Sequence, residues 1–234
     1  LFPYTTLFRS GTLRRGSGAW VPPAPSTSPL AFPGKALLLP DGRLLVSDSS
    51  HDSVVLLEGD EVVRRYPGFL QPQGLCLYDG QVLVADTGHH TVVRLDLDSG
   101  ALSTVAGTGA VWRPGDATAG PALSVNLSTP WDVAVWDGEV VVAMAGTHQL
   151  HALSDGQVRV LAGTTGEGLR DGHALSAYLA QPSGLAAGAD RLWFADAETS
   201  ALRWYRDGTV GTAIGTGLFD FGHRDGPAAE ALLQ

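Results

Sequence analysis

A carboxylate followed closely by two imidazoles could hold a metal ion or relay a proton. The segment QVLVADTGHHTVVRLD, residues 81–96, places Asp86 at the end of an apolar run, with His89 and His90 in the turn that follows. Histidine and aspartate are common zinc ligands and common general acids and bases. A catalytic group ordinarily occurs once, whereas a structural residue recurs with every repeat. The rest of the chain therefore decides between the two interpretations.

The segment belongs to a repeat. Four stretches of the chain open on a proline, at Pro33, Pro72, Pro130 and Pro182. An apolar strand then leads to a short turn, usually Asp-Gly (41–42, 79–80 and 137–138), and to a second strand. A third strand, a further turn (98–100, 155–156 or 207–208) and a fourth strand complete each unit. Two-residue Asp-Gly turns adopt positive φ and join antiparallel neighbours. Repeated units of this kind predict an all-β fold, a β-propeller with four-stranded blades.

The aspartate recurs with the repeat. Asp48, Asp86 and Asp196 close the second strand in three units, and Met144 stands there in the fourth. We expect these carboxylates to accept hydrogen bonds from backbone N–H groups of the following turn, as Asx residues commonly do. The histidines occupy two adjacent repeat positions, where each could bond to neighbouring backbone. The structural blade motif is therefore Asp48, Asp86, His90, Met144, His148 and Asp196.

Several stretches resemble a known repeat. ADTGHHTVVRLD, MAGTHQLHAL and ADAETSALRW resemble the NHL repeat, with His90 and His148 at its histidine and no residue matching its asparagine. Together with SPLAFPGK, TPWDVAV, AQPSGLA and LFDFGHRDG, they resemble the propeller of the thioredoxin-like, NHL-repeat-containing protein family. The blade with Met144 is the most specific mark of this resemblance.

The resemblance implies a six-bladed parent ring, with a thioredoxin-like domain before it and a small β domain after it. The chain would then hold about four blades and the start of a fifth, because EALLQ at its end precedes an expected proline. We expect an isolated arc of this kind to associate with itself, because its end blades would expose apolar strands.

The first 30 residues are expected to lie outside the propeller, which would span residues 31–234. Residues 1–10, LFPYTTLFRS, resemble translated sequencing-adaptor sequence, and the Gly-, Pro- and Ser-rich residues 11–30 are typical of a linker.

Composition excludes several function classes. Fifteen Lys and Arg against 24 Asp and Glu give a net charge of −9, which disfavours nucleic acid as a partner. No apolar run approaches the length that spans a bilayer, so no membrane association is expected. Cys76 is the only cysteine, which excludes an internal disulfide or a CxxC pair. No secretory signal is recognisable, and a cytoplasmic location is favoured.

Long insertions before Pro130, before Pro182 and at the end of the chain should meet the motif turns on one face of the propeller, where binding residues usually lie. The candidate binding face comprises Trp112, Arg113, Trp131, His148, Arg170, Phe219, Phe221 and Arg224. We expect a non-catalytic scaffold without cofactor or metal, whose partner is a protein or the family's own thioredoxin-like domain. The alternative is a metal-dependent lyase or lactonase, but the innermost strands offer almost no ligand beyond Asp132.

Overall fold

The computed structural model describes residues 28–218 and 222–233, which form four antiparallel blades. The first blade contains β1 (Pro33–Leu38), β2 (Leu44–Asp48), β3 (Ser53–Glu58) and β4 (Glu61–Pro67). The second contains β5 (Pro72–Tyr78), β6 (Gln81–Asp86), β7 (Thr91–Leu95) and β8 (Leu102–Ala106). The third contains β10 (Pro130–Trp136), β11 (Glu139–Met144), β12 (Gln149–Ser154) and β13 (Gln157–Ala162). The fourth contains β15 (Pro182–Ala187), β16 (Leu192–Asp196), β17 (Ala201–Arg206) and β18 (Thr209–Ile214).

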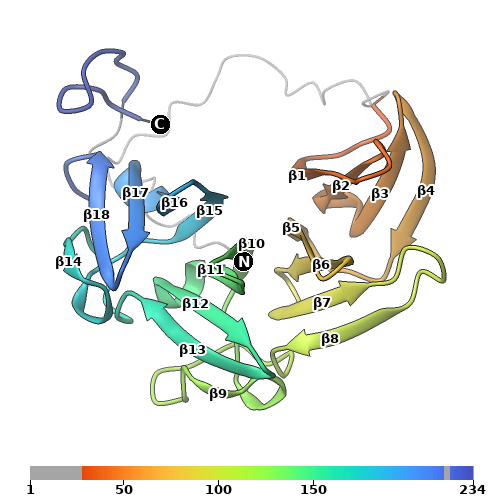
Figure 1. Ribbon diagram of the computed structural model, residues 1–234, viewed down its shortest axis with the longest axis horizontal. Coiled ribbons are helices and arrows are strands. Elements are labelled where there is room, and N and C mark those ends of the chain that lie inside the picture. The colour runs from red at the N-terminus through yellow and green to blue at the C-terminus, as the bar shows by residue number, and fades with distance from the viewer. Residues whose placement is uncertain (1–27, 219–221, 234) are drawn as a thin grey trace, which may run out of the picture.

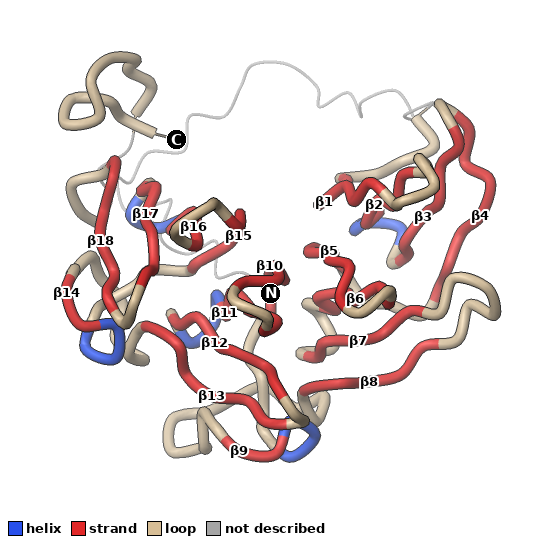
Figure 2. The backbone as a smooth tube through the Cα atoms, viewed as in Figure 1, coloured by secondary structure: helices blue, strands red, loops and turns tan. Residues whose placement is uncertain are grey.

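The blades surround a common axis as an arc, with β1, β5, β10 and β15 innermost (Figure 1). Figure 2 shows the short helical segments confined to the ends of the strands. Each is a single 3₁₀ turn, and in the described residues these turns lie at 49–51, 122–124, 145–147, 174–176 and 197–199. The predicted β-propeller with four-stranded blades is confirmed.

Most of the predicted hairpin turns have the expected backbone. Asp and Gly both have positive φ at 79–80, 137–138, 155–156 and 207–208, as a tight two-residue turn requires. The turn at 41–42 is different, because only Gly42 has positive φ there and its N–H donates to the carbonyl of Leu39. Pro40 lengthens this connection, since its fixed negative φ does not fit the tighter turn.

The long insertions run along the outer edges of the blades that they precede. β9 (Gly120–Pro121) pairs with β13, and β14 (Gly172–His173) pairs with β18, so the third and fourth blades each gain a fifth strand. The segment 222–233 has internal backbone hydrogen bonds that match those of 168–179. The N–H of Gly222 donates to Leu233 O at 3.1 Å, as that of Gly168 does to Leu179 O at 3.1 Å.

Apolar side chains fill the spaces between consecutive blades. One cluster lies between the first and second blades around Leu45 and Leu75, one between the second and third around Val92 and Met144, and one between the third and fourth around Leu150 and Phe194. The alternation of strand residues places one set of side chains in each neighbouring cluster. Leu38, on the first blade, is instead 68% exposed.

Candidate functional site

The three strand-end aspartates fasten each blade to the segment that leads into it. In each case Oδ1 accepts a backbone N–H from two residues before the opening proline. The pairs are Asp48 with Ala31 at 2.6 Å, Asp86 with Leu70 at 2.8 Å and Asp196 with Ala180 at 2.8 Å. The predicted donors in the following turn are therefore wrong. Antiparallel pairing sets each aspartate opposite its own opening proline, so the lead-in segment is the nearer donor.

The second carboxylate oxygen distinguishes the blades. Asp86 Oδ2 lies 2.8 Å from His89 Nδ1, and burial raises the pKa of this carboxyl group. Burial acts in the same direction on Asp48, but hydrogen bonds from Ala31, Arg65 and His51 outweigh it and leave the pKa of Asp48 lowered. A guanidinium in direct contact thus keeps the first-blade carboxylate ionised more firmly than an imidazole alone does in the second.

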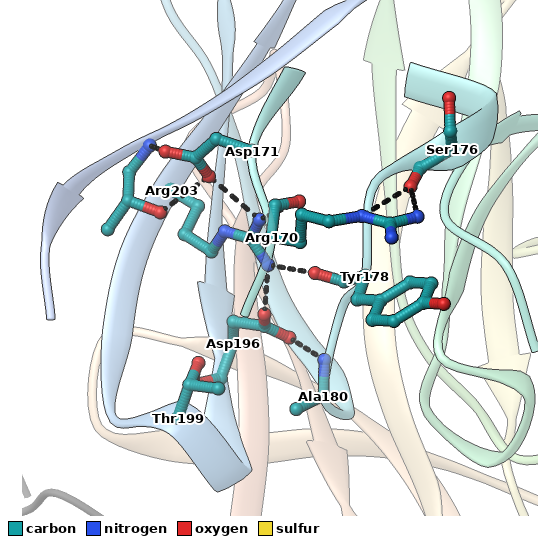
Figure 3. A network of polar contacts seen from close by, with 9 residues as sticks. Arg170, Asp171, Ser176, Tyr178, Ala180, Asp196, Thr199 and Arg203 are labelled. Carbon is teal, nitrogen blue, oxygen red and sulfur yellow. Dashed lines mark hydrogen bonds and ion pairs between the residues drawn. The ribbon is translucent and has the colours of Figure 1, made fainter. Parts of the chain in front are cut away.

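The fourth blade contains a fully buried ion pair (Figure 3). Arg203 Nη1 lies 2.7 Å from Asp196 Oδ2 and 2.7 Å from Tyr178 O. Its Nη2 reaches Asp171 at 2.9 Å, and Asp171 also accepts the N–H of Thr212 on β18 at 2.8 Å. Burial raises the pKa of Asp196, with Arg203 opposing that shift. Asp171 and Asp196 together tie the preceding insertion to the blade through one guanidinium.

The third blade has lost both charges of that pair. Met144 stands in place of the aspartate and His151 in place of Arg203, and both are buried. His151 Nε2 lies 3.1 Å from Gln149 Oε1, whereas its Nδ1 has no hydrogen-bond partner among the described residues. Burial lowers the pKa of His151 to about 4, so the ring stays neutral beside the apolar Met144. Met144 and neutral His151 thus occupy in the third blade the two positions that Asp196 and Arg203 occupy in the fourth.

The NHL-position histidines join one blade to the next. Backbone N–H groups donate to the Nδ1 atoms of His90 and His148, from Thr129 at 3.1 Å and from Gln181 at 3.2 Å. In the first blade Asp52 has this role, because its Oδ1 accepts the N–H of Gln71 at 2.8 Å. All three donors immediately precede the proline of the following blade. These histidines therefore accept hydrogen bonds from the backbone of the next blade, whereas the sequence predicted bonds to neighbouring backbone.

We call the end of the propeller that carries the turns 49–52, 87–90, 145–148 and 197–200 the loop face. A cavity of about 440 Å³ opens there between the second, third and fourth blades. Its lining includes Leu70, Gln71, His90, His148 and Gln181. Burial lowers the pKa of His90. The wall of this cavity thus combines two imidazoles, side-chain amides and one apolar side chain.

A second cavity, of about 370 Å³, lies at the axis, and Trp131 lines it. Lys35 and Asp132 also line it, and Lys35 Nζ lies 2.7 Å from Asp132 Oδ1. Asp132 Oδ2 also accepts the N–H of Leu185 at 2.8 Å, so one carboxylate joins the first, third and fourth blades. Gly74 lies between the two charged residues, where a Cβ would overlap Asp132.

The other predicted binding residues are spread over the insertions. Trp112 donates its ring N–H to Asp116 O at 3.0 Å, and Arg113 is exposed beside it. Arg170 lies over the ring of Tyr178 and donates to Ser176 O at 3.0 Å. Arg224 makes the equivalent bond to Glu230 O at 2.6 Å. Phe219 and Phe221 lie outside the described residues. The candidate face is thus divided, since only His148 lines the loop-face cavity while Trp131 lines the axial one.

Sequence reasoning missed the roles of Lys35, Asp52 and Arg203. Arg203 gave a signal, since a charged residue in ALRWY occupies an inward position of its strand. Within residues 28–218 and 222–233, no three His, Cys, Asp or Glu side chains gather as a metal site requires. No helix in the same residues is long and apolar enough to cross a bilayer.

Comparison with known proteins agrees with the repeat. The NHL repeat family matches residues 69–95 and 127–153. The chain is 34% identical over 247 residues to SUPPRESSOR OF QUENCHING 1, chloroplastic, of Arabidopsis thaliana, covering 91% of this chain and 23% of that protein. It is 31% identical over 256 residues to human NHL repeat-containing protein 2, covering 88% of this chain and 35% of that protein.

Among solved structures, virginiamycin B lyase from Staphylococcus aureus is similar in fold, with a TM-score of 0.54 and 13% identity over 80% of this chain and 57% of that one. The chain spans about a quarter to a third of the length of the two curated relatives. It carries NHL repeats in a β-propeller fold and is homologous to NHL repeat-containing protein 2 and to SUPPRESSOR OF QUENCHING 1.

Proposed function

We propose that this propeller is a non-catalytic scaffold whose loop face binds another protein domain. The proposal rests on the hydrogen bonds that the polar side chains of that face already accept from the backbone. Asp86 and Asp196 accept backbone amides of their own blades, and His90 and His148 accept those of the next. A general base or a metal ligand needs a lone pair directed at its substrate or ion. These groups direct theirs at the backbone instead, and so hold the face rigid.

A rigid face with a cavity and exposed loops suits recognition of a preformed surface. Arg113 is exposed and Val111 is 40% exposed on the insertion beside the loop face. Arginine flanked by aromatic and apolar side chains dominates many interfaces. The backbone N–H and the ring N–H of Trp112 already donate hydrogen bonds within the insertion. This side chain would therefore contribute contact area to an interface at little entropic cost.

The relatives supply a reason to look within the same polypeptide for the partner. The matched region is 35% of NHL repeat-containing protein 2, so most of that protein lies outside it. The family that the sequence resembles carries a thioredoxin-like domain next to its propeller. We propose that such a domain packs on the loop face, through an interface of the size and polarity common between domains of one chain.

The test is a calorimetric titration of the chain with a separately expressed thioredoxin-like domain of a homologous full-length protein. We expect saturable binding that Arg113→Glu weakens about tenfold, as loss of an interface arginine does. Glu61→Lys is the matched control, because Glu61 is an exposed residue on the outer strand β4. Heat-silent mixing at several hundred micromolar, with unchanged elution volume, would overturn the proposal. An equal effect of the two variants would place the interface elsewhere and would also overturn it.

A further inference from the structure

The hydrogen bonds of His90 and His148 determine which ring nitrogen carries the proton. A backbone N–H can only donate, so the Nδ1 atoms that receive Thr129 and Gln181 must be unprotonated. A neutral imidazole with an accepting Nδ1 carries its proton on Nε2. No described residue accepts a hydrogen bond from either Nε2, and both rings are half-buried. Each ring therefore retains one unused N–H donor.

Both rings line the loop-face cavity, and its floor is close to main chain. Gly88 and Gly146 lie there in the two motif turns, packed so tightly that a Cβ at either would overlap Leu70 or Ser128. The missing side chains let Leu70 and Ser128 pack directly against the two turns, so these glycines contribute only main-chain atoms to the cavity lining. Leu70, 38% exposed, offers an apolar contact at the rim.

The charge of the molecule selects among the groups that two N–H donors could bind. A net charge of −9 repels anionic ligands. Burial lowers the pKa of His90, which keeps that ring uncharged near neutral pH and gives it no Coulombic preference for an anion. A neutral carbonyl oxygen fits this environment better than a carboxylate does.

We propose that the loop-face cavity binds an extended polypeptide segment, whose main-chain carbonyl oxygens accept hydrogen bonds from the Nε2–H groups of His90 and His148. The inference rests on the proposed function, because it names the part of a partner domain that enters the loop face. Gly88 and Gly146 line the same cavity with main-chain atoms only, and Leu70 offers the segment an apolar contact. A cavity of about 440 Å³ accommodates only a few residues of such a segment.

The first test needs no partner domain and uses the whole chain labelled with ¹⁵N histidine. The probe is the uncharged peptide acetyl-Gly-Ala-Gly-methylamide, and sodium acetate is titrated in parallel. We expect the peptide to shift the Nε2–H signals of His90 and His148 saturably, and to leave those of His51 and His89 unchanged. Unmoved signals would overturn the inference. Shifts with acetate but not with the peptide would assign the donors to a carboxylate and would overturn it equally.

The chain offers its own replacement for the second test. Asp52 accepts the lead-in N–H in the first blade without offering a donor, so His90→Asp and His148→Asp should keep the blade junction and remove Nε2–H. We expect the double variant to bind the peptide at least about tenfold more weakly, with an unchanged unfolding midpoint. Undiminished affinity in a folded double variant would contradict the inference. Loss of folding would refute the equivalence of Asp52 and leave the ¹⁵N titration of the unaltered chain to decide.

The two proposals fail separately. A thioredoxin-like domain that gives no heat, combined with peptide-dependent shifts at both histidines, removes that partner and retains the cavity as a peptide site. Binding of the domain without any change at His90 or His148 retains the scaffold and removes the peptide site.

Discussion

Replacing Asp196 by methionine would copy into the fourth blade the residue that the third blade has at Met144. The two blades share their strand pattern, but only the fourth places a guanidinium beside this position. Asp196→Met should therefore strand a buried charge, whereas Met144 is tolerated because His151 is neutral. Adding Arg203→His completes the copy and should relieve the defect.

The magnitude follows from the burial of the pair. Neither Arg203 nor Asp196 exposes any side-chain surface, and the closest atoms are 2.7 Å apart. Removing one partner of a buried ion pair costs about 3–5 kcal/mol. Asp171 remains 2.9 Å from the guanidinium and is itself 42% exposed, so we expect the lower end, about 3 kcal/mol. The double variant should lose only about 1 kcal/mol, comparable to an ordinary core substitution.

Urea unfolding followed by the fluorescence of Trp193 and Trp204, both in the fourth blade, measures these losses. All four proteins of the double-mutant cycle are needed, because the expected signature is a coupling of more than about 2 kcal/mol between the two sites: the single and double variants differ by about 2 kcal/mol, and the loss from Arg203→His alone adds to this difference. If the losses of the two single variants add up to the loss of the double variant, the idea that Asp196 and Arg203 must be replaced together is refuted. A loss below about 1 kcal/mol for Asp196→Met alone would show that the guanidinium does not depend on this carboxylate.

Three further outcomes are expected. Gly74→Ala should cost about 1–3 kcal/mol in urea unfolding, because the new Cβ overlaps Asp132. Gly184→Ala at the same repeat position should be nearly neutral, since the nearest atom to its Cβ lies at 3.8 Å. Equal losses from the two variants would contradict the crowding argument. The pKa of His151 is about 4 in the folded protein and about 6.5 in the unfolded chain, so the unfolded state takes up a proton first as the pH falls. Acidification from about pH 7 to about pH 4.5 should therefore lower the free energy of unfolding by about 2.5 kcal/mol, and His151→Gln should not show this loss. A variant with the same acid dependence would exclude His151 as its source. Asp86→Ala should cost about 1–3 kcal/mol by leaving a backbone amide unpaired, and elemental analysis should find no stoichiometric metal before or after the change.

The repeat made the fold predictable. A proline, two short turns and a strand-end aspartate recur within one unit, and each carries a local conformational preference that survives in any context. The recurrence of Asp86 also predicted that this carboxylate accepts a backbone N–H. The donor could not be predicted, because the lead-in segment that supplies Leu70 N–H lies 16 residues away and only strand pairing brings the two together.

Longer-range partners were beyond prediction for the same reason. Lys35 and Asp132 are 97 residues apart and belong to blades that are not neighbours in sequence. Their contact depends on Gly74 lacking a side chain, a property of a third strand. Division of the candidate binding face had a related cause, since Trp131 on the innermost strand β10 and His148 in the motif turn lie at different positions of one blade and line different cavities.

The junctions between blades also bear on how such a chain could arise. The first three units each supply an acceptor from their own turn, and the second to fourth each supply a donor from their own lead-in. A tandem copy of one such unit would therefore meet its neighbour with a hydrogen bond already in place. The donor is a main-chain amide, which no substitution other than proline removes. Mutation can therefore exchange Asp52 for a histidine, or the reverse, one blade at a time without a matching change in the adjacent copy. Duplication followed by independent drift is open to this architecture, whereas interfaces built from paired side chains would need two coordinated changes.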